Sequence, residues 1–259
     1  MVVIGGGLLG LEAAYGLAKA GARVTLLHLM DRLMERQLDQ RAALMLKRAV
    51  EAKGIAVRLQ AQTARIAGSG RVEAVELRDG TTIAADAVVV AVGIRANIGL
   101  ARAAGLEVGR GIVVDDHLET STAGVHAIGE CAEHRGCCYG LVEPAYEQAQ
   151  LLARRLAGER ASYPGSVLAT NLKVSGVNVF SAGDFLAATD EAEEIVFSDP
   201  AVGIYKKLII AHDRLVGAVL FGDTADGLWY LDLIRAGSSV AHIRDDLVFG
   251  RALATRVAA

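Results

Sequence analysis

The first ten residues constrain the fold more than any other part of the chain. Residues 1–5, Met-Val-Val-Ile-Gly, form an apolar, β-branched run that predicts a buried parallel strand. Glycine-rich residues follow up to position 10, and residues 11–20 are rich in alanine and leucine, as in a helix. Residues 23–28, Arg-Val-Thr-Leu-Leu-His, predict a second strand. This order within about 30 residues predicts a βαβ unit with two parallel strands.

The glycines between the first strand and the helix have the spacing of a dinucleotide-binding turn, Gly5-x-Gly7-x-x-Gly10. Gly5 permits the tight turn, Gly7 lets the backbone approach a pyrophosphate, and Gly10 allows close packing of helix on strand. The helix N-terminus presents free N–H groups to the phosphates. A turn that keeps its glycines only for packing is the alternative. The predicted cofactor-binding residues here are Gly5, Gly6, Gly7, Leu8, Leu9 and Gly10.

The second strand is predicted to end at His28, where a dinucleotide site usually has Asp or Glu to bind the ribose hydroxyls. A neutral imidazole can also bond a hydroxyl, whereas a protonated one, with Arg32 one turn away, would favour the 2′-phosphate of NADP. We predict that His28 binds the cofactor, with NADH favoured and NADPH left open. In a second hypothesis His28 is a capping residue that is turned away from the ligand.

Beyond this unit, the pattern predicts an α/β chain that continues through a meander into a smaller α+β region. A helix over 38–53, capped by Asp39, precedes a third strand at 55–59. Glycine-containing breaks then separate short strands of an antiparallel meander. The later predicted strands are 63–67, 72–77, 82–92, 112–115, 125–129, 172–180, 194–198, 203–211 and 215–221, the helices 98–104, 143–157 and 225–236, and the linker 162–165.

Composition excludes several classes of protein. The longest run without polar or charged side chains is residues 1–11, far shorter than the roughly 20 residues of a membrane-spanning helix. Aromatic residues make up 5% of the chain and no Lys/Arg run interleaves with them, which argues against a nucleic-acid partner. Residues 1–11 also lack the basic start and cleavage site of a signal peptide, so we predict a cytoplasmic protein without a membrane partner.

Two constellations resemble catalytic or metal sites, and neither is assigned such a role. Tyr15-x-x-x-Lys19 matches a dehydrogenase pair but lies on the helix that packs on the sheet. The second group gathers four soft ligands within eight residues, with a spacing that fits no iron–sulfur pattern. Its members are Cys131, His134, Cys137 and Cys138, which we interpret as small residues packed near a ligand. We therefore predict no catalytic side chain and no metal ligand.

Several strings of residues resemble the FAD-dependent pyridine-nucleotide oxidoreductases. They are residues 3–14, Val-Ile-Gly-Gly-Gly-Leu-Leu-Gly-Leu-Glu-Ala-Ala, residues 91–97, Ala-Val-Gly-Ile-Arg-Ala-Asn, and residues 125–131, Val-His-Ala-Ile-Gly-Glu-Cys. Residues 28–39, 129–136 and 180–185 are similar, more narrowly, to the large subunits of assimilatory NAD(P)H nitrite reductases. The similarity extends along nearly the whole chain.

The resemblance implies a split flavin domain with the nicotinamide domain inserted between its halves. Residues 1–94 would be the NAD(P)H-binding domain, 95–163 the C-terminal half of the FAD-binding domain, and 164–259 a small α+β C-terminal domain. It also implies that Glu12 lies near the nicotinamide carboxamide and that Gly129 and Glu130 meet the ribityl and phosphate region of FAD. Glu130 departs from the aspartate of the wider family. Val92 and Gly93 join the predicted cofactor-binding residues.

The same resemblance implies partners that the sequence does not contain. No second glycine fingerprint follows a strand, and no cysteine follows Cys138, so the first FAD half and the iron–sulfur and sirohaem segments would lie elsewhere. The predicted reaction is hydride transfer from NAD(P)H to FAD. Those electrons would then feed nitrite reduction to ammonia on the other segments. Alternatives are a stand-alone rubredoxin- or ferredoxin-reductase-like flavoprotein and a non-catalytic nucleotide-binding or docking module. A second copy of the chain is a further candidate partner.

Overall fold

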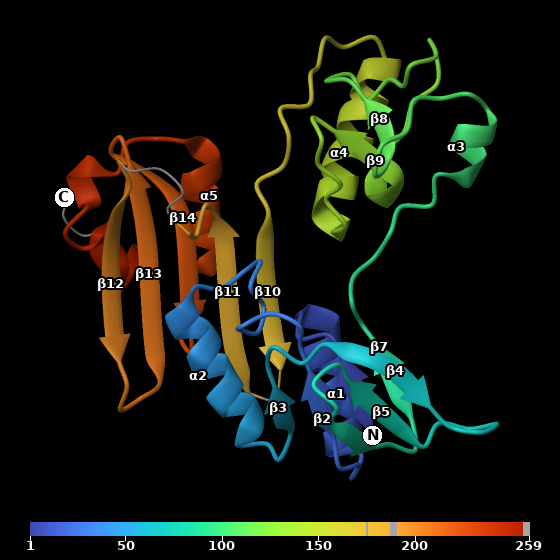
Figure 1. The fold of residues 1–259 in the computed structure, drawn as a ribbon. Helices are drawn as coiled ribbons and strands as arrows, with labels where there is room; N and C mark the ends of the chain where they lie inside the picture. The colour runs from blue at the N-terminus through green and yellow to red at the C-terminus, as the bar shows by residue number, and fades with distance from the viewer. Residues whose placement is uncertain (175, 187–190, 256–259) are drawn as a thin grey trace. The chain divides into compact units, whose positions relative to one another are not determined.

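The computed structural model describes residues 1–174, 176–186 and 191–255. These residues form two compact units (Figure 1). Unit 1 consists of Met1–Gly93 together with the C-terminal part from Ala169, and unit 2 of Ile94–Leu168. The α/β fold predicted from the sequence is confirmed, and each unit is described by itself.

Unit 1 contains a parallel sheet with the strand order β3-β2-β1-β7. The strands are β1 (Val2–Ile4), β2 (Thr25–Leu27), β3 (Ala56–Arg58) and β7 (Val88–Val90). Helix α1 (Leu8–Lys19) connects β1 to β2, so the predicted βαβ unit is confirmed. Helix α2 (Gln40–Glu51) begins after Asp39, whose carboxylate accepts a 2.9 Å hydrogen bond from the N–H of Ala42 as the predicted cap.

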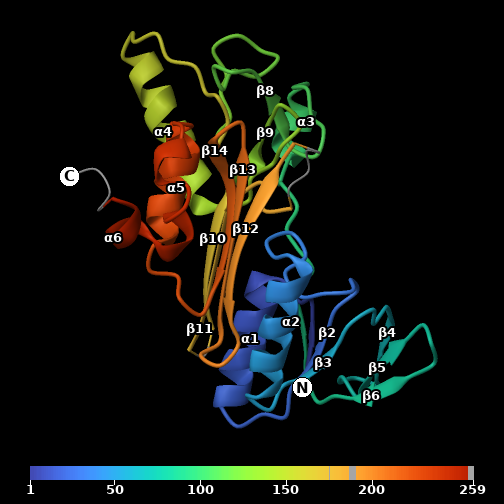
Figure 2. The same ribbon diagram turned by 90° about the vertical axis from the view of Figure 1, so that its left-hand side faces the viewer.

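Helices α1 and α2 cover one face of the parallel sheet, and the antiparallel meander covers the other (Figure 2). The meander consists of β4 (Thr63–Ala67), β5 (Ala74–Leu77) and β6 (Thr82–Ala84). The single predicted strand 82–92 is wrong, because the structure divides it into β6 and β7. The chain changes sheets at Ala85–Ala87: the N–H of Ala85 bonds to Glu73 O, whereas Ala87 O accepts from the N–H of Val2 in β1.

The remainder of unit 1 is a five-stranded antiparallel sheet with the order β10-β11-β14-β13-β12. The predicted strand 172–180 is wrong, because the chain turns back at Gly176, where φ is +78°, and forms two paired strands. A glycine is needed there because the left-handed region is costly for other residues. The elements are β10 (Ala169–Val174), β11 (Val177–Gly183), β12 (Glu193–Asp199), β13 (Ile204–Ala211), β14 (Arg214–Phe221), α5 (Gly227–Ala236) and α6 (Arg251–Ala254).

One apolar core joins this antiparallel sheet to the two helices of the nucleotide-type fold. Leu11 of α1 and Leu46 of α2 lie in the same buried cluster as Val219 of β14. The hydroxyl of Tyr205 on β13 donates a 2.6 Å hydrogen bond to Asp39, the residue that caps α2. The start of α2 is therefore held from the C-terminal sheet.

Unit 2 has little regular structure. It contains α3 (Gly99–Ala103), the short parallel strands β8 (Ile112–Val114) and β9 (Ala132–His134), and α4 (Val142–Leu156). The predicted strand 125–129 is wrong for the described structure, in which only an isolated bridge from His126 to Glu119 pairs this segment. The N–H of Thr120 donates to Val125 O and the N–H of Ala127 donates to Leu118 O, so the segment pairs with residues 118–120 over too short a stretch to form a strand.

The predicted linker 162–165 is part of the core of unit 2. Tyr163 is 2% exposed, and its ring centroid lies 4.8 Å from that of His134. The unit continues to Leu168, so this segment with its proline and glycine lies within the unit. None of the helices in the described ranges has the length and apolar character needed to cross a membrane.

Candidate functional site

The glycine turn at the carboxyl end of β1 needs two of its glycines for the chain's own packing. Gly5 has a φ of +120°, and an ideal Cβ there would lie 2.1 Å from Ala91 O. A Cβ on Gly10 would lie 1.8 Å from Gly5 O. Any side chain at either position therefore forces the backbone to move. This agrees with the roles predicted from the glycine spacing, a tight turn at Gly5 and close packing of helix on strand at Gly10.

Gly7 is different, because the chain itself does not require a glycine there. Its φ of −83° and ψ of −175° are open to any residue, and an ideal Cβ has no neighbour within 4 Å. Gly7 is the N-cap of α1, and in the described structure no side chain caps this helix. The first N–H groups of a helix have no partner within it and carry partial positive charge. The turn thus leaves open space over a helix end suited to an anion.

The segment that follows β7 lies beside this turn. The N–H of Ala91 donates a 2.8 Å hydrogen bond to Ile4 O, and the contact between Ala91 and Gly5 places Val92 and Gly93 just past it. Val92 is 69% exposed, and Gly93 has a φ of +109°. The structure therefore brings Val92 and Gly93 to the same end of the sheet as the glycine turn. Glu12 lies exposed on α1, in the turn after Gly7.

His28 follows β2, is 8% exposed, and has hydrogen-bond partners for both ring nitrogens. The N–H of Gly6 donates to Nδ1 at 3.0 Å, and Nε2 lies 3.0 Å from Oε2 of Glu35. This geometry favours the hypothesis that His28 caps the turn. Direct binding of ribose by His28 stays a prediction, and it would require the bond to Glu35 to open.

Gly6, which lies between the first two glycines of the fingerprint, is required by the segment after β2. An ideal Cβ on Gly6 would lie 2.6 Å from Cδ2 of Leu33 and 2.7 Å from Cγ of His28. The N–H of Met34 also donates a 3.0 Å hydrogen bond to Gly6 O. Sequence reasoning missed Leu33, Met34 and Glu35 as parts of the site, although they lie within residues 28–39, a stretch that carries the family resemblance.

Gly129 and Glu130 belong to unit 2, in the short 3-10 helix Gly129–Cys131. Gly129 has a φ of +78°, and its N–H donates a 2.7 Å hydrogen bond to Oε1 of Gln148. Gln148 is 1% exposed and lies on α4. Glu130 is exposed. The predicted flavin-facing pair is therefore held by a buried glutamine that sequence reasoning did not single out.

The cysteine and histidine group of unit 2 is held mainly by packing and ion pairs. All three cysteines are free thiols, and burial raises the pKa of Cys138. His134 is buried, and its Nε2 lies 2.9 Å from Oδ1 of Asp116. Hydrogen bonds from Arg135 and then His134 lower the pKa of Asp116 to about 2. No group of three or more potential ligands in the described residues is arranged to hold a metal ion.

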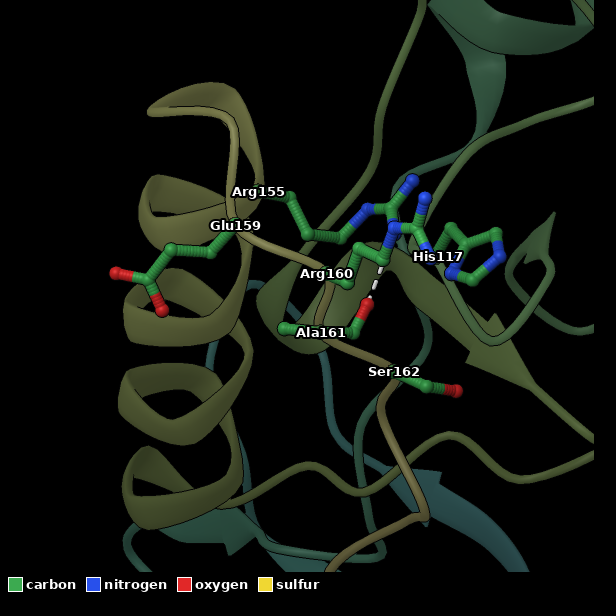
Figure 3. A pocket seen from close by; sticks show the side chains of 6 residues that line it. All are labelled: His117, Arg155, Glu159, Arg160, Ala161 and Ser162. Carbon is green, nitrogen blue, oxygen red and sulfur yellow. Dashed lines mark hydrogen bonds between the residues drawn. The ribbon is translucent and has the colours of Figure 1, made fainter.

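A cavity of about 480 Å³ lies at the C-terminal end of α4 in unit 2, lined by His117, Arg155, Glu159, Arg160, Ala161 and Ser162 (Figure 3). The side chains of Arg155 and Arg160 extend toward His117, whereas Glu159 points away and pairs with Arg154. The guanidinium of Arg155 donates a 2.8 Å hydrogen bond to Ala161 O. This bond fixes the loop after α4, and none of these residues was predicted as a site.

Comparison with known families agrees with the glycine turn and its surrounding fold. The sequence profile of the pyridine nucleotide-disulphide oxidoreductases matches residues 1–155. The chain belongs to this family. A second profile, the rubredoxin NAD+ reductase C-terminal domain, matches residues 169–238 of this family member. The resemblance predicted from the sequence is confirmed.

Individual relatives are similar to this chain along most of its length. A Bacillus subtilis protein named nitrite reductase [NAD(P)H] is 50% identical over 92% of this chain, and the assimilatory nitrate reductase electron transfer subunit of the same organism is 42% identical over 95%. The chain spans only 30% and 32% of those two proteins. The crystal structure of a ferredoxin reductase for the CYP199A2 system of Rhodopseudomonas palustris superposes with a TM-score of 0.80 at 27% identity, covering 95% of this chain and 64% of that one.

Proposed function

We propose that this chain binds NAD(P)H and delivers its hydride to FAD, as part of a larger flavin-dependent oxidoreductase. The observation that carries the proposal is the open space at Gly7 over the uncapped N-terminus of α1. Packing within the chain explains why positions 5, 6 and 10 are glycines, but it gives no reason for a glycine at position 7. A bound pyrophosphate supplies that reason, because it must approach the backbone closely.

Each predicted residue of unit 1 has a place in this proposal. Gly5, Gly7 and Gly10 with the N–H groups of Leu8 and Leu9 would hold the pyrophosphate. Val92 and Gly93 lie beside the turn, where they would border the nucleotide. The exposed carboxylate of Glu12 would meet the nicotinamide carboxamide, and His28 would act on the turn through Gly6.

The flavin part of the proposal rests on unit 2 and on the relatives. When both cofactors are bound, the nicotinamide supplies a hydride and FAD accepts it. The Gly129 N–H is taken by Gln148, so this glycine would approach FAD through its bare Cα, and Glu130 would supply a hydrogen-bond acceptor. A flavin half on another segment of a longer protein fits the length of the relatives. The two B. subtilis relatives are about three times as long as the part this chain matches.

The functional division into domains follows from this proposal. We assign residues 1–94 to NAD(P)H binding, 95–163 to the second FAD half and 164–259 to the small C-terminal domain. In the nitrite reductase version, iron–sulfur and sirohaem centres on other segments receive the electrons and reduce nitrite to ammonia in the cytoplasm. The chain alone would then produce no ammonia from NADH and nitrite, even with added FAD. Ammonia production by the pure chain would refute this version.

A second candidate is a reductase that passes electrons to a small redox protein such as rubredoxin or ferredoxin. The match of residues 169–238 to the rubredoxin NAD+ reductase C-terminal domain favours it. A non-catalytic nucleotide-binding module is the third candidate, and flavin content distinguishes it: the reductases need bound flavin, whereas such a module binds nucleotide without flavin.

The proposal is tested by the variant Gly7→Val. The Cβ of a valine meets no neighbour within 4 Å in the free protein, so the thermal unfolding midpoint should stay close to that of the wild type. It would occupy the space of the pyrophosphate, so the Kd for NADH and NADPH in calorimetry should rise at least a hundredfold, or about 2.7 kcal/mol.

The matched control is Gly16→Val, an exposed position on the same helix where a Cβ also meets no neighbour within 4 Å. This control should bind both nucleotides like the wild type. Unchanged nucleotide affinity in Gly7→Val would refute the pyrophosphate site.

A further inference from the structure

We propose that Glu35, positioned by His28, is the residue that selects NADH over NADPH, an inference that rests on the proposed nucleotide site. His28 occupies the place after β2 where an acidic residue usually binds the adenosine ribose. The structure shows that the imidazole is turned to the glycine turn and that a carboxylate from the following segment bonds to its other side. A carboxylate is therefore present near this place, but it belongs to Glu35, seven residues further along the chain.

The hydrogen bonds determine the tautomer of His28. A backbone N–H can only donate, so the bond from Gly6 requires a lone pair on Nδ1. The proton then lies on Nε2, which donates it to Oε2 of Glu35 at 3.0 Å. His28 in this form connects the glycine turn to the carboxylate and fixes the distance between them.

The Glu35 carboxylate is placed to accept further hydrogen bonds. Its side chain is 23% exposed, so it is held by the chain yet reachable from solvent. Oε2 faces His28, and Oε1 lies 4.0 Å from Nε of Arg36, a side chain that is 86% exposed. A carboxylate oxygen next to the turn can accept from the 2′- and 3′-hydroxyls of an adenosine ribose, and its charge repels a 2′-phosphate.

Arg32 is the group that would favour the opposite choice. Its guanidinium lies 3.2 Å from Oδ1 of Asp31, so it already forms an ion pair with a carboxylate. The segment thus presents two acidic and two basic side chains: Asp31, Glu35, Arg32 and Arg36. Among these four, Glu35 is the one bonded to the residue that holds the glycine turn, and so its position relative to the cofactor is the most constrained.

The test measures Kd values of the full chain for NADH and NADPH by calorimetry. The wild type should bind NADH more tightly. Glu35→Gln keeps the size of the side chain and removes its charge, and it should lower the preference for NADH about tenfold, chiefly by tighter binding of NADPH. Glu51→Gln, an exposed glutamate at the end of α2 that pairs with Lys47, is the matched control and should leave the ratio unchanged.

A second variant separates positioning from folding. The Oδ1 of an asparagine can replace Nδ1 as the acceptor for Gly6, but the shorter side chain cannot donate to Glu35. His28→Asn should therefore keep the unfolding midpoint and lower the NADH preference in the same direction as Glu35→Gln. Nitrogen NMR of the wild-type imidazole should show the proton on Nε2.

The outcomes distinguish this inference from the proposed function. NADH binding by the wild type together with an unchanged affinity ratio in Glu35→Gln would overturn the role of Glu35 and leave the nucleotide site in place. A proton on Nδ1 would likewise overturn the positioning by His28. Failure of the wild type to bind either nucleotide would overturn both the inference and the proposed function.

Discussion

The parallel sheet of unit 1 and the two-stranded sheet of unit 2 differ in size and in the elements packed against them. In unit 1, Val2 packs toward the meander and Val3 toward the helices, and both are at most 1% exposed. Unit 2 pairs only three residues of β8 with three of β9. Its exposed apolar side chains include Leu100 at 86% and Leu156 at 71%.

The difference shows where each unit obtains its stability. Unit 1 contains the strands and helices that its own sheets need, and burial of apolar surface stabilises it. A two-stranded sheet is only marginally stable alone, so unit 2 depends on the small apolar core around Leu118 and Tyr163 and on polar contacts such as Gln148 with Gly129. Under the proposed function, a further segment that carries the first FAD half would add contacts to unit 2.

The largest expected effect comes from supplying that segment. FAD should bind the chain alone with a Kd of about 1–40 μM, since contacts from the proposed first FAD half would provide about a third to a half of the roughly 12 kcal/mol of a nanomolar site. Adding the region upstream of the match in the B. subtilis nitrite reductase should lower the Kd by three orders of magnitude or more. Flavin fluorescence titration measures both values. Tight one-to-one binding of FAD by the chain alone would show that its flavin site needs no further segment.

The next largest effect concerns the packing within unit 1. Gly10→Ala places a Cβ 1.8 Å from Gly5 O, so α1 must move away from β1. We expect a loss of about 3 kcal/mol in the free energy of unfolding, as for an overpacked core. Chemical denaturation followed by circular dichroism measures it.

Gly16→Ala on the same helix is the control for that experiment. It has no neighbour within 4 Å of the new Cβ and should increase stability by about 0.5–1 kcal/mol. Equal stability changes of the two variants would contradict the tight contact between α1 and β1.

A smaller effect is expected from a polar contact in unit 2. Gln148→Leu removes the acceptor of the Gly129 N–H and leaves this donor without its partner in a half-buried position. We expect a loss of about 1–3 kcal/mol. The amide of Gly129 should also exchange with deuterium faster. An unchanged exchange rate would show that this bond does not hold the turn.

The smallest effect is a dependence on pH in unit 2. The Asp116 pKa is lowered from 3.8 to about 2 by hydrogen bonds from Arg135 and then His134. A lowered pKa in the folded state means that the pairing stabilises the fold above about pH 4, and that this part is lost as the pH falls toward 2. Asp116→Asn should lack this dependence between pH 4 and pH 2 in thermal unfolding.

Arg135→Gln provides the internal check for that pH dependence. It removes the largest cause of the lowered Asp116 pKa. The pH-dependent loss of stability should therefore be complete at a higher pH than in the wild type. The same pH dependence in Asp116→Asn and in the wild type would assign the acid sensitivity to other carboxylates.

Local sequence patterns predicted the elements whose causes are local. The β-branched run at 1–5, the glycine spacing after it and the cap at Asp39 act over a few residues, and each is found in the structure. The same is true of the meander's first strand at 63–67, which has the predicted bounds. Gly5 and Gly10 could also be assigned distinct tasks, because the turn geometry that demands them is the same in all such units.

Other features depend on contacts between residues far apart in the sequence, so local patterns could not predict them. Whether residues 125–129 form a strand depends on the length of the neighbouring segment. Residues 82–92 are divided because β6 pairs with β5 of the meander, whereas β7 pairs with β1 of the parallel sheet. The direction of His28 follows from Gly6, 22 positions earlier, and from Glu35. Spacing along the chain reports contacts within one turn or one strand, whereas hydrogen bonds between remote segments form only when the fold brings their donors and acceptors within about 3 Å.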